Sequence, residues 1–245
     1  MAENPEETSA STIDAPTLAA ARSLRYVFYR QGWHLAAAFA LSAVAWFLAN
    51  PALGDGRFLG ISDRAWFWVT IAVSILHQLL GWLVFRGQLG WGILTRWFGE
   101  RDLHIWGLIF MPLLAGRPLT ILALALADSG SLTMPLFMRI LLGVLFILPA
   151  GYAVWSVLRY FGIERALGGD HFRLHFRKMA FVGEGAFRWS SNAMYAYVFL
   201  GLWSIALLAD SRAALAAAFF QHAFVWAHYY CTEEPDMTLM YGTSA

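Results

Sequence analysis

The chain has 245 residues, of which 59% are hydrophobic and 13% are charged, whereas an ordinary soluble domain carries about 25% charged residues. This composition indicates an integral membrane protein. The formal net charge of +1 excludes nucleic acid as a partner, and the single cysteine, Cys231, excludes an internal disulfide and a multi-thiolate metal site.

Residues 1–21 are rich in acidic and small residues. They lack the basic start and the apolar core of a secretory signal peptide. We expect a disordered cytoplasmic tail over this segment, followed by a single transmembrane helical domain over residues 22–245.

Apolar runs predict the membrane spans, because a helix needs about 20 residues to cross the hydrocarbon. The fold class that they predict is an all-α bundle of about six spans, at roughly residues 32–49, 66–85, 103–127, 135–160, 194–209 and 213–231. The third span carries Arg117 and Pro118 near its middle. It is either a broken helix, a helix with a snorkelling arginine, or one whose arginine faces the interior.

Basic residues orient this bundle, since they gather on the cytoplasmic side of a membrane. Twelve of the seventeen Lys and Arg fall on one side: Arg22, Arg25, Arg30, Arg86, Arg96, Arg101, Arg159, Arg165, Arg173, Arg177, Lys178 and Arg188. Four fall on the other side: Arg57, Arg64, Arg139 and Arg212. We therefore expect both termini and the loop at about residues 161–193 in the cytoplasm. One Lys among seventeen basic residues and abundant Ala indicate a bacterial genome, so we expect a multi-pass protein of a bacterial inner membrane.

The last two spans form a hairpin that brings two different helix ends together. Ser190, Ser191 or Asn192 can cap the start of the fifth span, and a helix start favours an anion. The sixth span ends at Glu233 and Glu234, on the same side of the membrane. An anion-favouring helix start beside two carboxylates suits a zwitterionic ligand, with one glutamate facing that ligand and the other pairing with Arg188 or a neighbouring loop arginine. The alternative is a solvated helix end.

Two motifs on this hairpin resemble a known family. The segments "GAFRWSSNAMY" (residues 185–195) and "EEPDMTLMYG" (residues 233–242) are similar to the two motifs of integral-membrane methyltransferases. This family includes phospholipid N-methyltransferases and isoprenylcysteine carboxyl methyltransferases. The resemblance covers roughly residues 150–245, the region that we expect to be catalytic.

The resemblance implies S-adenosylmethionine as the cofactor, bound in a pocket that faces the cytoplasm. The cofactor-binding residues that it implies are Gly185, Arg188, Asn192, Tyr195, Glu233 and Glu234. With an amine acceptor, Glu233, Glu234 or His228 is the candidate general base. The chain departs from the first motif at Ser191 and Ala193, where the family usually has arginine and proline.

The function that we expect is methyl transfer to a lipidic acceptor, first of all a phospholipid amine headgroup. Three alternatives stay open: an isoprenylcysteine carboxyl methyltransferase, a protein that keeps the fold without catalysis, and a haem-binding protein using a pair such as His77 and His222. The pair His171 and His175 has helical metal-ligand spacing without a third ligand, so we expect no metal site and contact with lipid headgroups instead.

Overall fold

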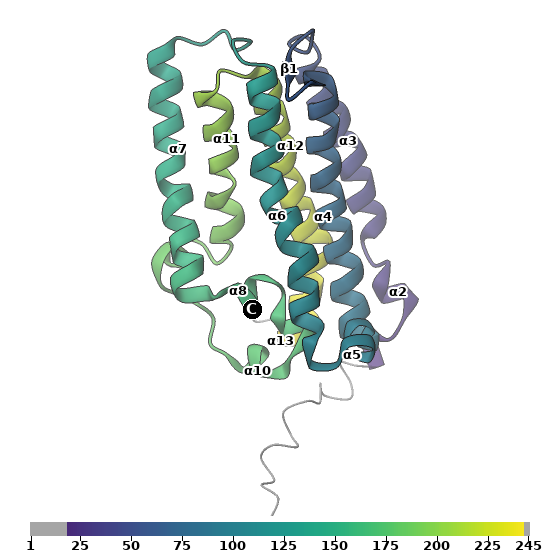
Figure 1. Cartoon of the computed structure of the whole chain (residues 1–245). Helices are drawn as coiled ribbons and strands as arrows, with labels where there is room; N and C mark the ends of the chain where they lie inside the picture. The colour runs from purple at the N-terminus through teal and green to yellow at the C-terminus, as the bar shows by residue number, and fades with distance from the viewer. Residues whose placement is uncertain (1–18, 243–245) are drawn as a thin grey trace, which may run out of the picture.

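Long helices run side by side through the computed structural model, which describes residues 19–242 (Figure 1). They are α3 (Gln31–Ala49), α4 (Asp63–Trp91), α6 (Asp102–Ala127), α7 (Leu136–Ser156), α11 (Leu200–Leu208) and α12 (Arg212–His228). Three π-helical segments extend this set: η2 (Val157–Phe161) after α7, η4 (Met194–Val198) before α11 and η5 (Tyr229–Glu233) after α12. The all-α fold class is therefore confirmed.

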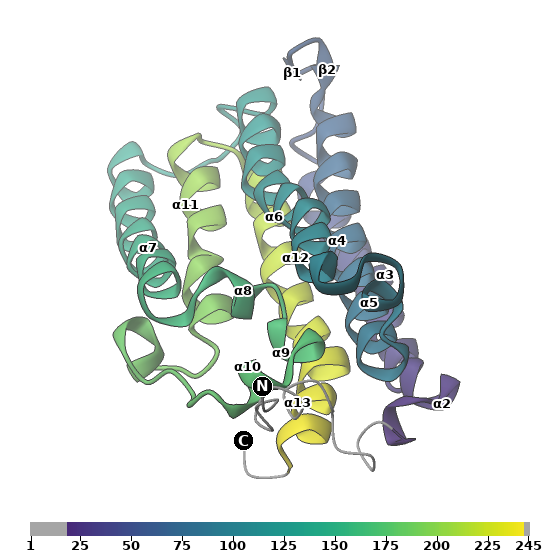
Figure 2. The same cartoon turned by 60° about the horizontal axis from the view of Figure 1, so that its bottom comes forward.

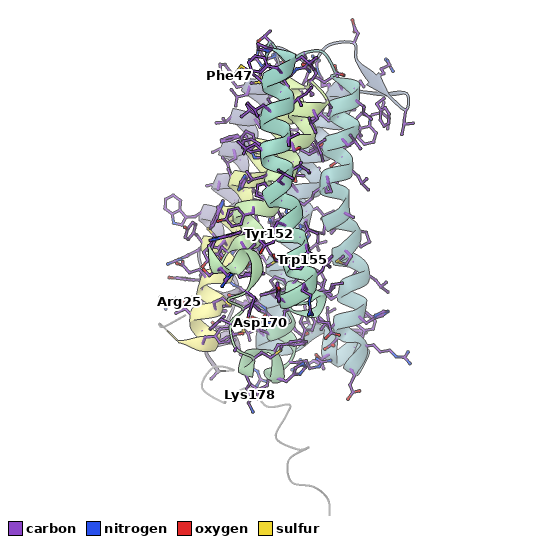
Figure 3. All side chains as sticks on the ribbon, turned by 90° about the vertical axis from the view of Figure 1, so that its left-hand side faces the viewer. Arg25, Phe47, Tyr152, Trp155, Asp170 and Lys178 are labelled. Atoms are coloured by element: carbon purple, nitrogen blue, oxygen red, sulfur yellow. The ribbon has the colours of Figure 1, made fainter. Side chains whose placement is uncertain are left out.

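Shorter elements close the two ends of the bundle. One end carries α2 (Leu24–Val27), α5 (Ile93–Phe98), η1 (Gly99–Arg101), α8 (Ile163–Ala166), α9 (Gly169–Phe172), α10 (Leu174–Lys178), η3 (Gly185–Arg188) and α13 (Glu234–Tyr241). The other end carries an antiparallel hairpin of β1 (Arg57–Phe58) and β2 (Ile61–Ser62). In Figure 3, Arg25, Asp170 and Lys178 lie at the first end and Phe47 lies at the second.

A helix occurs at each of the six predicted span positions. Within residues 19–242, four helical segments are long and apolar enough to cross a membrane: 24–49, 63–91, 93–127 and 136–161. Their outer faces carry exposed large apolar side chains such as Phe39, Phe47 and Leu148, as expected for an integral membrane protein. The count of six spans and the cytoplasmic position of the termini stay predictions. So does the disordered tail predicted over residues 1–21, of which residues 1–18 lie outside the described residues.

Helix α12 is the centre of the bundle and packs against α3, α4, α6 and α11. It begins at Ser211, whose hydroxyl accepts a hydrogen bond from the amide of Ala214 at 3.0 Å. Its contact with α3 is built from small residues, which let two helix backbones approach closely. The buried alanines available for this contact are Ala38, Ala45 and Ala49 on α3 and members of the set Ala213, Ala214, Ala216, Ala217 and Ala218 on α12.

Arg117 faces the interior of the bundle. Helix α6 continues without a break through Pro112 and Pro118, so the broken-helix and snorkelling alternatives are wrong. Only 3% of Arg117 is exposed, and its guanidinium donates to Gln221 Oε1 at 2.8 Å and to Ser74 Oγ at 3.1 Å. Its Cζ atom also lies 4.6 Å from the centroid of the Phe199 ring. Neighbouring helices thus supply the polar and aromatic partners that a buried guanidinium needs.

Helix α12 does not end at the two glutamates. The helical path continues through η5 into α13 and ends at Tyr241, before Gly242, whose φ of 81° favours glycine (Figure 2). The alternative of a solvated helix end is therefore wrong. Both glutamates lie inside a continuous helical segment, where their side chains point in different directions.

Candidate functional site

Glu233 lies where the hairpin of the last two long helices opens towards the loop. The Tyr195 hydroxyl, from η4, donates a hydrogen bond to Glu233 Oε2. On the helix that carries Glu233, His228 Nε2 lies 3.5 Å from Glu233 Oε1. The Glu233 side chain is 23% exposed, whereas that of His228 is 2% exposed. The structure thus brings together three of the predicted site residues, one from the first motif and two from the end of the sixth span.

Glu234 points away from this cluster, towards α3. Its Oε2 lies 2.8 Å from Nη1 of Arg30, and both side chains are about two-fifths exposed, 41% for Arg30 and 42% for Glu234. The predicted pairing with Arg188 or another loop arginine is therefore wrong. Arg188 is exposed at the end of η3 and makes no hydrogen bond or ion pair within residues 19–242. Arg30 reaches the glutamate because it adopts a left-handed backbone conformation (φ 63°) in the turn before α3.

The π-helical segment η5 is held by side chains from α3 and α4. Pro235 has no N–H, so the carbonyl of Cys231, four residues earlier, lacks its usual helical partner. That carbonyl accepts instead from Gln31 Nε2 at 3.0 Å and from Arg86 Nη2 at 2.9 Å. Cys231 itself is buried. The local geometry that aims Glu233 thus depends on two side chains far away in the sequence.

A buried charge network lies directly behind the two glutamates. Asp236 is fully buried, and its Oδ1 accepts from Arg86 Nε at 2.9 Å and from the Tyr26 hydroxyl at 2.6 Å. Its Oδ2 lies 3.3 Å from His171 Nε2, and His171 Nδ1 lies 3.1 Å from Asp170 Oδ1. Sequence reasoning missed this network. One signal was present, because Asp236 lies in the second motif, about one helical turn after the glutamates.

His171 is enclosed by the protein, so the predicted contact with lipid headgroups is wrong for it. Its ring stacks on Phe85 with centroids 4.5 Å apart, whereas His175 is exposed. Arg173 separates α9 from α10 in extended conformation, so the two histidines do not share a helix face. Burial opposes a charge on His171, but Asp170 and Asp236 outweigh it and raise its pKa to about 10. A protonated His171 therefore joins two carboxylates and fixes the loop to α13.

The Glu233 carboxyl has a raised pKa. Burial raises it to about 7, and the hydrogen bond from Tyr195 and the charge of His171 only partly oppose this shift. The nearby carboxylates of Asp170 and Asp236 contribute to this rise. Near neutral pH this carboxyl can accept or release a proton, as a general base requires.

His228 and His34 form a buried pair beside Glu233. Their ring centroids are 5.2 Å apart, and His34 Nδ1 lies 2.9 Å from Gln31 Oε1. The Gln31 amide nitrogen already donates to the carbonyl of Cys231, so its oxygen accepts from His34 Nδ1. His34 Nε2 and His228 Nδ1 have no hydrogen-bond partner within the described residues. The site therefore holds polar atoms that a ligand or water can bind.

The glycine of the first motif has a structural explanation. Gly185 has a φ of 60°, and a Cβ atom there would lie 2.5 Å from Ser156 Oγ and 3.0 Å from Tyr160. Ser156 Oγ also accepts from the amide of Ala186 at 3.0 Å. Gly185 thus lets the loop approach α7, which positions the chain that enters η4.

The fifth long helix begins close to the predicted residue, with a different cap. The carbonyl of Asn192 accepts from the amides of Tyr195 and Ala196, both at 3.0 Å. The Asn192 amide donates to Ser190 Oγ at 3.2 Å, within the preceding turn. No side chain caps η4 in the described part of the chain, so the predicted side-chain cap is wrong.

The histidines proposed for haem have separate neighbours. His222 Nδ1 accepts from Trp203 Nε1 at 3.1 Å, whereas the His77 ring packs on Phe110 with centroids 4.4 Å apart. Residues 19–242 contain no group of three or more His, Cys, Asp or Glu that could hold a metal ion. Nothing in this geometry favours the haem alternative.

The segment that forms the hairpin and its loop also matches a family model. Residues 138–244 match the phospholipid methyltransferase family. The resemblance to integral-membrane methyltransferases is thereby confirmed, and the match supports a membrane methyltransferase acting on a lipid-type substrate. Comparisons with curated proteins and with solved structures find no match.

The match to the phospholipid methyltransferase family begins inside α7 and covers η4, η5 and α13. It therefore includes Tyr195, His228 and Glu233. It does not include Arg30, Gln31, His34 or Arg86, although these residues contact η5 and its neighbours. The site is thus assembled from the matched segment and from helices α3 and α4 outside it.

Proposed function

We propose that this protein transfers a methyl group from S-adenosylmethionine to a lipid with an amine headgroup, and that Glu233 is central to the site. The observation that supports the proposal is the position of this carboxylate. It is partly exposed, it is bound by Tyr195 and it faces His228 at the end of the bundle where the basic residues gather. We further propose that this end faces the cytoplasm of a bacterial inner membrane.

The residues at the site fit the charges of the proposed cofactor. Tyr229 packs against both Tyr195 and Trp226, with ring centroids 6.0 Å and 5.9 Å apart, and Tyr230 lies against Trp226 at 6.1 Å. Aromatic faces and a carboxylate attract a sulfonium or an ammonium. The first motif of the family usually has a further arginine where this chain has Ser191. The exposed Arg188 is therefore the motif arginine that remains to bind the cofactor carboxylate.

S-adenosylmethionine, when bound, supplies a methyl group attached to a sulfonium sulfur. A bond from the acceptor nitrogen to the methyl carbon forms while the carbon–sulfur bond breaks, and the sulfur becomes a neutral thioether. The ammonium of the acceptor must first lose a proton, and Glu233, with a pKa of about 7, accepts it. The remaining contribution of the protein is to align the nitrogen, the methyl group and the sulfur, and to exclude water.

Methyl transfer in reconstituted vesicles tests this proposal. Purified protein in liposomes containing phosphatidylethanolamine is incubated with S-adenosylmethionine carrying a labelled methyl group, and the lipids are separated. We expect label in mono- and dimethylated phosphatidylethanolamine, and none with Glu233→Gln. The matched control is Glu184→Gln, because Glu184 is exposed on the loop. In liposomes that also contain a prenylated cysteine, label on its carboxyl ester instead of on the lipid amine would overturn the acceptor class.

A further inference from the structure

A groove opens on the outer face of α3, beside the ion pair of Arg30 and Glu234. It has a volume of about 740 Å³ and is lined by Tyr29, Arg30, Gly32, Trp33 and Ala36. A Cβ atom at Gly32 would meet nothing within 4 Å, so the groove is open at that point. All of these residues lie outside the segment that matches the phospholipid methyltransferase family.

The groove combines one charge of each sign with an apolar track. At its end near the loops, Arg30 and Glu234 form an exposed ion pair at 2.8 Å, and Glu234 adjoins Glu233 in the chain. Away from this pair the groove continues over Trp33, which is 76% exposed, and Ala36. Because α3 belongs to a segment long and apolar enough to cross a membrane, this track faces the acyl chains of the bilayer.

These features match a phospholipid that carries both a phosphate and an amine. A phosphate can replace Glu234 on Arg30, while the ammonium replaces Arg30 on Glu234. This exchange of partners leaves no charge unpaired, and Arg binds phosphate with two parallel hydrogen bonds. An exposed ion pair contributes little to stability, so its opening has a low energetic cost.

We propose that this groove is the docking site of the acceptor lipid, a zwitterionic glycerophospholipid with a primary amine headgroup. Its phosphate binds Arg30, its amine lies at Glu234 and an acyl chain follows Trp33 and Ala36. Glu234 is next to Glu233 in the chain but its side chain points towards Arg30, so the groove holds the lipid beside the site formed by Glu233. The identity of the lipid as acceptor rests on the proposed function, whereas its docking in the groove does not.

Lipid retention measured without catalysis tests the docking itself. The protein is reconstituted in nanodiscs that contain equal amounts of phosphatidylethanolamine and phosphatidylglycerol. It is then released from the nanodiscs, and native mass spectrometry identifies the lipids that stay bound to it. We expect phosphatidylethanolamine to be retained by the unmodified protein and by Ala43→Trp, and lost from Ala36→Trp. Ala43 is the matched control because it lies two turns further along the same helix, is exposed, and does not line the groove. Equal retention by the two tryptophan variants would overturn the docking site, and equal retention of phosphatidylglycerol would overturn the role of the amine.

A second pair of variants separates docking from cofactor binding. For Arg30→Gln we expect the KM for phosphatidylethanolamine in mixed micelles to rise about tenfold, as loss of one charge-assisted contact implies. The affinity for S-adenosylhomocysteine, measured by calorimetry, should not change. Arg25→Gln, at an exposed arginine outside the groove, should alter neither value. Loss of S-adenosylhomocysteine binding in Arg30→Gln alone would place Arg30 at the cofactor and contradict the docking role. If the unmodified protein does not bind S-adenosylhomocysteine, the proposed function is contradicted. The lipid-retention measurement would still test the groove in that case.

Discussion

Glu233 and Glu234 are neighbours in the chain, yet their side chains lie in different surroundings. Glu233 contacts Tyr195 and His228, whereas Glu234 forms an exposed pair with Arg30. Two adjacent helical positions differ by about 100° in direction, which explains why the two glutamates have different partners. The sequence does not predict which glutamate turns inward, because that depends on the π-helical segment before them.

The raised pKa of Glu233 predicts a pH dependence of cofactor binding. A carboxyl attracts a sulfonium only when ionised, and the ionised fraction of Glu233 rises as the pH passes through about 7. Calorimetry between pH 5.5 and 8.5 should therefore show tighter S-adenosylmethionine binding at the higher pH. The groups facing Glu233 are Tyr195, His228 and the buried carboxylates behind it. An affinity that falls as the pH rises would contradict the role of this carboxylate.

Asp236 should matter for stability more than any exposed acid. Asp236→Asn leaves Arg86 and His171 as buried cations without their shared carboxylate, which should cost about 3–5 kcal/mol of unfolding free energy. Thermal unfolding in detergent measures this loss, with Asp55→Asn in the exposed loop before β1 as the control. Equal unfolding temperatures for the two variants would show that the buried network contributes nothing.

The same network sets how stability depends on pH. The pKa of His171 is about 10 in the folded protein, above its usual value of 6.5. The folded state therefore holds this proton more tightly than the unfolded state, so its stabilising effect is complete below about pH 6.5 and is lost as the pH rises through 10. We expect the unfolding temperature to fall over that window, and to fall less in His171→Gln.

At the scale of single elements, η5 depends on the missing N–H of Pro235. Pro235→Ala adds a donor that competes with Gln31 and Arg86 for the carbonyl of Cys231. The variant should stay folded and should bind S-adenosylhomocysteine more weakly, because the π-helical segment no longer aims Glu233 in the same way. Pro149→Ala, which removes a proline from the interior of α7, is the control and should leave this affinity unchanged. Unchanged binding in both variants would show that η5 does not position Glu233 for cofactor binding.

The loop before η4 depends on Gly185. Gly185→Ala places a Cβ atom against Ser156 at a left-handed backbone position, so we expect a loss of about 1–3 kcal/mol in unfolding free energy. Gly151→Ala is a matched change on α7, where a Cβ atom would meet nothing within 4 Å and a helical alanine is favourable. Chemical denaturation should therefore show a lower free energy of unfolding for Gly185→Ala and an unchanged or higher one for Gly151→Ala. Equal stability of the two would mean that the loop moves away from α7 without cost.

The positions of the long helices were predictable from the sequence, because the length of an apolar run reports the thickness of the membrane. The end of the last helix was not predictable in this way. Pro235, Asp236 and the two glutamates are typical of a helix end in sequence, but partners on α3, α4 and the loop stabilise the continued helix. The π-helical segments have no apolar period of their own, so hydrophobic spacing does not detect them.

At the scale of the whole molecule, the site is built from distant parts of the chain. The matched segment supplies Tyr195, His228 and Glu233, helices α3 and α4 supply Gln31 and Arg86, and the turn before α3 supplies Arg30. Motif reasoning predicted the first set, because those residues lie in or beside the family motifs. It missed the second set, because the pairing of a polar side chain with a partner 150 or 200 residues away depends on how the helices pack.

The most direct test of the central claim is calorimetric titration of S-adenosylmethionine into the purified full-length protein, with Glu233→Gln and Glu234→Gln alongside. The account predicts saturable binding that Glu233→Gln loses and Glu234→Gln keeps, since only Glu233 faces the site formed by Tyr195 and His228. Binding that survives in Glu233→Gln, or that is absent from the unmodified protein in both detergent and nanodiscs, would contradict it.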